Sequence, residues 1–157
     1  HQEAGRRPGT EVVALAAGMA RALESWDADR TARTDRIQAF RDRLQAGLET
    51  SAGPTVINGH PDHRLPNTLN IAFPGLDGEA ILVALDLEHV ACSLGSTCSS
   101  GSAEPAPALV AMGRSEDVYR ASVRFSVGLE NTFEEIDEAV RRVSDVVARL
   151  RESAPVA

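Results

Sequence analysis

The chain has 157 residues, of which 43% are hydrophobic and 25% are charged, with a formal net charge of −7; this balance is typical of one soluble globular domain. No apolar run approaches the roughly 20 residues that would cross a bilayer, and no N-terminal signal segment is found, so we expect a cytoplasmic protein with no membrane partner. The negative charge and the lack of a basic tract argue against direct nucleic-acid binding.

Lysine is missing from the composition, because all sixteen basic residues are arginine. The chain therefore cannot form a Schiff base from a lysine of its own. Its two cysteines, Cys92 and Cys98, are too few for a secreted disulfide framework, and we expect them to be reduced. The opening letters HQEAGRRPGT contain no initiator Met, so we expect the chain to be part of something longer.

Helical spacing of apolar residues predicts two helices in the first third of the chain. We expect Thr10 to cap the first of them, whose apolar face comprises Val12, Leu15, Ala16, Met19, Leu23 and Trp26. The second helix is expected near residues 31–50, with one apolar stripe formed by Ile37, Phe40, Leu44 and Leu48.

Short strands and helices then alternate. Strands are expected at residues 56–57, 68–73, 89–92 and 121–127, and short helices at 78–87 and 107–112. In the last strand Ala121, Val123, Phe125 and Val127 face one way and Ser122, Arg124 and Ser126 the other. Thr132 and Glu135 form a capping box, which opens a long C-terminal helix with an apolar face of Phe133, Ile136, Val140, Val143, Val147 and Leu150. This order predicts an α+β fold with helices packed against a small, mainly antiparallel sheet.

Cys98 lies in a Ser/Gly-rich loop, GSTCSSGSAEP, with little around it that could bury a thiol. One interpretation is an exposed cysteine without a role, mostly protonated at neutral pH. The other is a mobile nucleophile that collects a group in one place and delivers it in another, and the flexible neighbours favour it. Cys92, among apolar residues, is expected to be a packed structural residue, and His60 and His63 are expected at the surface.

Two further positions have both a structural and a functional interpretation. Arg124 is either a surface arginine or, because a guanidinium fork matches the two oxygens of a carboxylate, a carboxylate clamp. Thr10 is either a helix cap alone or part of an anion site in which backbone N–H groups at a helix N-terminus bind phosphate.

Several segments, in order along the chain, resemble the NifS/IscS-type cysteine desulfurases. They are HQEAGRRPGTE at the start, LPNTLNIAFPGLDGEAIL in the middle, the cysteine loop SLGSTCSSGSAEPAPALVAMG, and SVRFSVG followed by NTFEEID. The resemblance covers essentially the whole chain, and the cysteine loop and the arginine strand are its most specific parts.

The resemblance implies a homodimeric, pyridoxal-5′-phosphate-dependent enzyme of the class V aminotransferases (fold type I) that takes sulfur from L-cysteine, leaving L-alanine. By this resemblance, Cys98 matches the catalytic cysteine that carries the sulfur as a persulfide, and Arg124 matches the arginine that binds the substrate carboxylate. Thr10 matches the threonine that reaches the cofactor phosphate of the partner subunit. Implied sulfur acceptors are an iron–sulfur scaffold protein and tRNA-thiolation proteins, and Cys98 is also implied as a metal ligand to a transient iron–sulfur cluster.

The same resemblance implies a division of the chain. Residues 1–30 would be the end of the large-domain cofactor region with a linking helix, and residues 31–157 the C-terminal small domain, in which 93–105 form the mobile cysteine loop. The large domain with the cofactor lysine is absent from this chain, so we expect the 157 residues alone to be inactive. The alternatives are a non-catalytic sulfur-carrier or interaction module that accepts persulfide from a separate enzyme, and a degenerate piece with a stable fold and no role.

Overall fold

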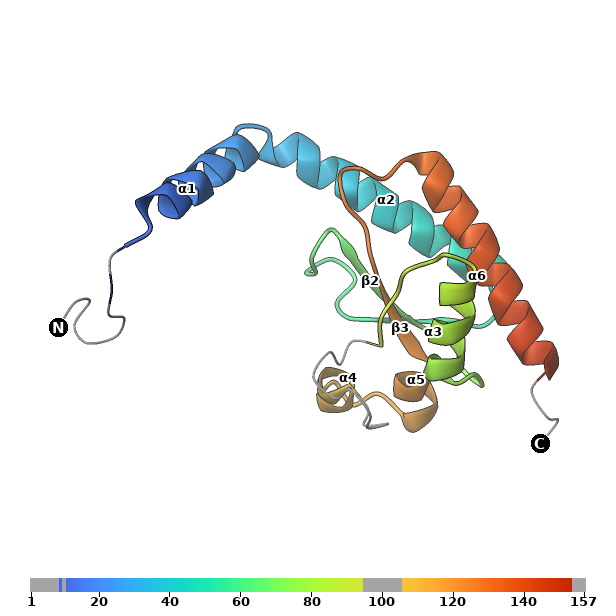
Figure 1. Ribbon diagram of the computed structural model, residues 1–157. Helices are drawn as coiled ribbons and strands as arrows, with labels where there is room; N and C mark the ends of the chain where they lie inside the picture. Colours follow the sequence, from blue (N-terminus) through green and yellow to red (C-terminus); the bar gives the residue numbers. More distant parts are fainter. Residues whose placement is uncertain (1–8, 10, 95–105, 154–157) are drawn as a thin grey trace. The chain divides into compact units, whose positions relative to one another are not determined.

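The computed structural model of the chain describes residues 9, 11–94 and 106–153, which fall into two units, residues 1–34 and 35–157. In the described part of the chain no helix is both long enough and apolar enough to cross a membrane. The elements follow in the order α1, α2, β1, β2, α3, α4, α5, β3, α6 (Figure 1).

Helix α1 (Val13–Ala28) forms most of the described first unit. It has no buried residue, and its predicted apolar face is exposed. The N-cap position belongs to Val12, which makes no side-chain capping bond, so the predicted cap at Thr10 is wrong. Thr10 itself lies outside the described residues.

The core of the second unit lies against one face of a three-stranded antiparallel sheet. The sheet has the order β1 (Val56–Asn58), β2 (Thr68–Ala72) and β3 (Ser122–Ser126). Leu69 and Ile71 of β2 and Val123 and Phe125 of β3 are at most 5% exposed and belong to one buried cluster. The alternation of apolar residues in the two longer strands therefore buries the face that the sequence predicts.

Three helices cover this apolar face: α2 (Arg30–Ser51), α3 (Gly78–Leu87) and α6 (Phe133–Ser153). Helices α3 and α6 lie side by side (Figure 1). The predicted stripe of α2 is buried as expected, and Ile136, Val143 and Val147 of α6 join it in the core. Phe133 is 44% exposed and packs edge-on against Phe40, with ring centroids 4.9 Å apart.

Local hydrogen bonds set the starts of α6 and α3. Thr132 Oγ1 accepts the Glu135 N–H at 3.2 Å, and a Glu135 carboxylate oxygen accepts the Thr132 N–H at 3.0 Å, which confirms the capping box. The Asp77 carboxylate accepts two backbone N–H groups at the start of α3.

The predicted strand at residues 89–92 is wrong. His89 has a left-handed φ of 58°, its N–H donates to Asp86 O, and the N–H of Val90 donates to Leu85 O. These bonds form a Schellman motif, in which a left-handed residue just past a helix satisfies the last carbonyls. The segment therefore ends α3, and only Ser93 makes a bridge, to Arg124 of β3.

The second face of the sheet is covered at one end by helix α5 (Glu116–Arg120), which the sequence analysis missed. Val118 and Ala121 pack there on Ala72 and Val56. Helix α4 (Pro107–Ala111) precedes it and is followed by Gly113 in a left-handed conformation. The remaining part of this second face carries polar side chains.

Candidate functional site

Four polar residues lie in register across the second face of the sheet. Asn58 of β1 pairs with Asn70 of β2, Asn70 pairs with Arg124 of β3, and Arg124 pairs with Ser93 at the isolated bridge. Directly paired residues of antiparallel strands project to the same side, and we call these four residues the polar row. The residues on either side of Asn70 and Arg124 along their strands are apolar core residues: Leu69 and Ile71 on β2, and Val123 and Phe125 on β3. Because successive side chains of a strand point to opposite faces, the polar row faces away from α2, α3 and α6.

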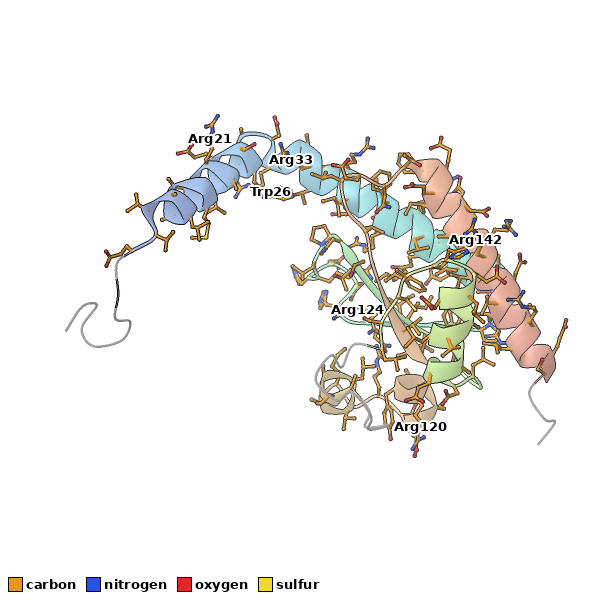
Figure 2. All side chains as sticks on the ribbon, viewed as in Figure 1. Arg21, Trp26, Arg33, Arg120, Arg124 and Arg142 are labelled. Carbon is orange, nitrogen blue, oxygen red and sulfur yellow. The ribbon has the colours of Figure 1, made fainter. Side chains whose placement is uncertain are left out.

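Arg124 is half-buried in this row, on the strands and away from α3 and α6 (Figure 2). Its side chain makes no hydrogen bond or ion pair with any described residue, and its Nε is buried without an acceptor. Every other arginine in the described ranges pairs with a carboxylate, a side-chain amide oxygen or a backbone carbonyl. Arg64 and Arg114 also have buried nitrogens without an acceptor, but each makes one bond elsewhere. Among the described arginines, Arg124 therefore has a guanidinium with no partner at all, and its donors are left for an acceptor from elsewhere.

The backbone around Arg124 is fixed on both sides. Its N–H donates to Ser93 O at 2.6 Å, and its carbonyl accepts the Ser93 N–H at 3.0 Å, while β2 lies on its other flank. The side chain of Arg124 therefore starts from a fixed point of the sheet and presents a planar fork of donors. This arrangement suits a carboxylate, whose two oxygens accept two parallel N–H donors.

Next to Arg124, Asn58 and Asn70 of the polar row form a small hydrogen-bond network with Ser122. The Asn58 Nδ2 donates to Asn70 Oδ1 at 2.8 Å and to Ser122 Oγ at 2.9 Å, and the Ser122 hydroxyl donates to Val118 O at 2.7 Å. Asn58 and Ser122 are 5% and 2% exposed. Their burial means that this network is part of the folded framework, and sequence analysis missed it because its members come from three different strands.

The other predicted site residues are Cys98 and Thr10. Both, like the cysteine loop from residue 95 onward, lie outside the described residues, so their predicted roles stay predictions. Where the structure describes the chain, no three His, Cys, Asp or Glu side chains gather in a way that could hold a metal ion.

Cys92 packs against the hydrophobic core, as expected, although in no strand. Burial, and to a lesser extent the charge of Asp86, raises the pKa of its thiol to about 11. A thiol with such a pKa is almost fully protonated at neutral pH and is a poor nucleophile. His60 and His63 are exposed, also as expected, and His60 Nδ1 accepts the backbone N–H groups of Asp62 and His63.

Known proteins provide the context for this arrangement. Residues 1–139 match the family model described as aminotransferase class-V. The cysteine desulfurase NifS of Azotobacter vinelandii is 42% identical over 99% of the chain, and the cysteine desulfurase IscS of Anaeromyxobacter sp. (strain K) is 42% identical over 98%. The chain spans only 39% and 38% of these two relatives' own lengths.

Solved structures agree with the sequence matches. A NifS-like protein superposes on 95% of the chain with a TM-score of 0.78 and 26% identity, and the chain covers 37% of it. The X-ray structure of a NifS-like protein from Rickettsia africae ESF-5 superposes on 94% with a TM-score of 0.76 and 27% identity, and the chain covers 38% of it. These matches confirm the predicted family and the α+β fold, and the chain belongs to the aminotransferase class-V family.

Proposed function

We propose that residues 1–157 form part of a pyridoxal-phosphate-dependent cysteine desulfurase in which Arg124 holds the carboxylate of the L-cysteine substrate. The observation that carries this proposal is the guanidinium of Arg124, unpaired among the described residues, on a rigid strand of a chain that is 42% identical to proteins named cysteine desulfurase. An amino acid has a carboxylate at one end, and a guanidinium that binds this carboxylate orients the molecule for reaction at the other end.

The cofactor does not fit this chain by itself. A pyridoxal phosphate enzyme binds its cofactor through a lysine, and none of the 157 residues is lysine. The lysine must therefore come from other polypeptide, and the part described here contributes substrate binding. This agrees with the chain spanning less than two fifths of the named relatives.

Cys98 is proposed to receive the substrate sulfur as a persulfide and to pass it to acceptor proteins. What supports this assignment is the match of its loop to the family's cysteine loop, together with the raised pKa of the other thiol, Cys92. In the same proposal Thr10 binds the cofactor phosphate of a partner subunit in a homodimer, and the protein works in the cytoplasm. Its acceptors include the machinery of iron–sulfur cluster assembly, with Cys98 a transient cluster ligand.

The substrate role of Arg124 is tested in the full-length protein that contains this chain. Arg124→Ala is expected to raise the KM for L-cysteine by about 30-fold or more, since losing one partner of a charged hydrogen-bonded pair costs about 2–5 kcal/mol. Arg120→Ala is the matched control, because Arg120 pairs only with exposed Glu116 on the surface of α5. Sulfide and L-alanine are measured with L-cysteine as substrate, and equal KM values for the two variants would refute the clamp.

The role of Cys98 is tested by mass spectrometry. After incubation of the full-length protein with L-cysteine, a peptide containing Cys98 should gain the mass of one sulfur atom. Cys98→Ser should lose this adduct and sulfur transfer while it retains bound cofactor. Retained turnover in that variant would remove Cys98 from the role, and an adduct that forms only with a separate persulfide donor would favour a sulfur-carrier module instead.

A further inference from the structure

The position of Asn70 beside Arg124 follows from the hydrogen-bond pattern of β3. In an antiparallel strand the N–H and C=O of one residue point to the same flank. Both groups of Arg124 bond to Ser93, so Arg124 and its other neighbour, Asn70, form a non-hydrogen-bonded pair. Such pairs have their Cα atoms only about 4.5 Å apart and their side chains close together.

The orientation of the Asn70 amide follows from the network behind it. Ser122 gives its one hydroxyl hydrogen to Val118 O, so its Oγ can only accept, and Asn58 must turn its Nδ2 toward it. The same Nδ2 donates its second hydrogen to Asn70, which accepts it with Oδ1 because an amide nitrogen could not. The Nδ2 of Asn70 is thereby directed away from Asn58 and has no partner among the described residues.

The network holds this orientation at a cost. Asn58 Oδ1 is buried without a hydrogen-bond partner, which is unfavourable for a polar atom. Turning the Asn58 amide would not remove the problem, because its oxygen would then face the Ser122 oxygen, and two acceptors would meet. The arrangement that leaves Asn70 with a free donor is therefore the one that the buried residues impose.

We propose that Asn70 is a second substrate-binding residue, whose Nδ2 donates a hydrogen bond to the carboxylate that Arg124 binds. This inference rests on the proposed function and extends it to a residue that sequence reasoning did not single out. Asn70 and Arg124 both present donors on one face, and the row contains no acidic side chain that could pair with them. A planar anion with several acceptor sites is the ligand that such a set of donors suits.

Two substitutions at one position separate binding from a structural role. Asn70→Leu removes both functions of the amide. Asn70→Asp retains an oxygen that can accept the bond from Asn58, but it replaces the free donor with a negative charge beside Arg124. Thr68→Val, two residues earlier on the same face and opposite Ser126, is the control for altering this strand.

The experiment uses the full-length enzyme and two competitive inhibitors. L-alanine has a carboxylate, and L-alaninamide has an amide in its place. Asn70→Leu is expected to raise the KM for L-cysteine and the inhibition constant of L-alanine by about 10- to 100-fold, as for a hydrogen bond to a charged group. Asn70→Asp should raise both at least as much. The inhibition constant of L-alaninamide, the kcat of each variant and all constants of Thr68→Val should change less than about 3-fold.

The outcomes separate this inference from the function on which it rests. If Asn70→Asp behaves like the wild type while Arg124→Ala has a raised KM, Asn70 serves the fold alone and the inference is wrong. Equal losses for L-alanine and L-alaninamide would overturn it as well, because a general distortion would then explain the effect. A wild-type enzyme that releases no sulfide from L-cysteine would overturn the proposed function and this inference together.

Discussion

Gly47 lies in the interior of α2, where glycine is normally unfavourable, and the structure explains why it is there. A Cβ on Gly47 would lie 2.6 Å from Val140 Cγ2 and 2.9 Å from Val140 Cγ1, whereas carbon atoms in contact are about 3.5–4.0 Å apart. The two helices α2 and α6 therefore approach closely at this point, and glycine makes that approach possible.

Gly47→Ala sets two effects against each other. Alanine favours a helix over glycine by about 0.5–1 kcal/mol, whereas overpacking a well-packed site costs about 1–3 kcal/mol. The clash involves the branched end of Val140, which has one strongly preferred rotamer in a helix, so the side chain has little room to turn away. We expect a net loss of about 1 kcal/mol in the free energy of unfolding.

Urea unfolding of the 157-residue chain, followed by far-UV circular dichroism, measures this loss. The double variant Gly47→Ala/Val140→Ala should be more stable than the sum of the single changes predicts, by about 1 kcal/mol, because the new methyl group fills the space that Val140 vacates. Gly18→Ala is the control, since a Cβ at Gly18 in α1 meets nothing within 4 Å, and it should raise helicity without lowering the midpoint. If Gly47→Ala is as stable as the wild type and shows no coupling to Val140→Ala, the close approach of the helices is wrong.

Three further predictions concern other parts of the second unit. The pKa of Cys92 is raised to about 11, so in a Cys98→Ser chain iodoacetamide should alkylate Cys92 slowly at pH 8. The alkylation rate should still increase toward pH 11, and a rate that reaches a plateau near pH 9 would contradict this prediction. Thr132→Ala removes the capping hydroxyl of α6 and should cost about 1 kcal/mol in urea unfolding, while an unchanged midpoint would show that the cap is dispensable. The hydrogen bond from Arg43 lowers the pKa of Asp137. The stabilising contribution of this ion pair is therefore present above the unfolded pKa of about 3.9 and is lost as the pH falls through the lower folded pKa. Asp137→Asn should reduce the acid sensitivity of the thermal midpoint, and a pH profile identical to that of the wild type would count against the pair.

Local patterns in the sequence predict much of this fold because their causes are local. The spacing of Phe40, Leu44 and Leu48 fixes the buried face of α2, and the Thr132–Glu135 capping box fixes the start of α6. Strand alternation likewise places Arg124 on the polar face. In each case the residues that decide the structure are within a few positions of one another.

The predictions that failed concern segments whose structure does not follow from the spacing of apolar residues. Residues 89–92 are apolar enough for a strand, but His89 adopts the left-handed conformation that ends α3, a position usually held by glycine. Helix α5 has only five residues, too few to show the helical spacing of apolar residues, although Ser115 followed by two acidic residues is a weak signal for a helix start.

The candidate site could be predicted only in part, for the same reason. Arg124 is visible in the sequence as a polar residue on a strand, but its neighbours Asn70 and Ser93 are 54 and 31 positions away and meet it only through strand register. Register is set by pairing across the sheet, so neither the polar row nor the unpaired state of the guanidinium can be read from spacing.

The distance between Arg124 and the substrate carboxylate tests the central claim most directly. It can be measured in a crystal structure of the full-length enzyme with L-cysteine or a carboxylate-bearing inhibitor bound. We predict two guanidinium nitrogens of Arg124 at about 2.7–2.9 Å from the two carboxylate oxygens, with the Asn70 Nδ2 in hydrogen-bond contact with one of them. A carboxylate held by other residues, with the Arg124 side chain directed elsewhere, would contradict the account.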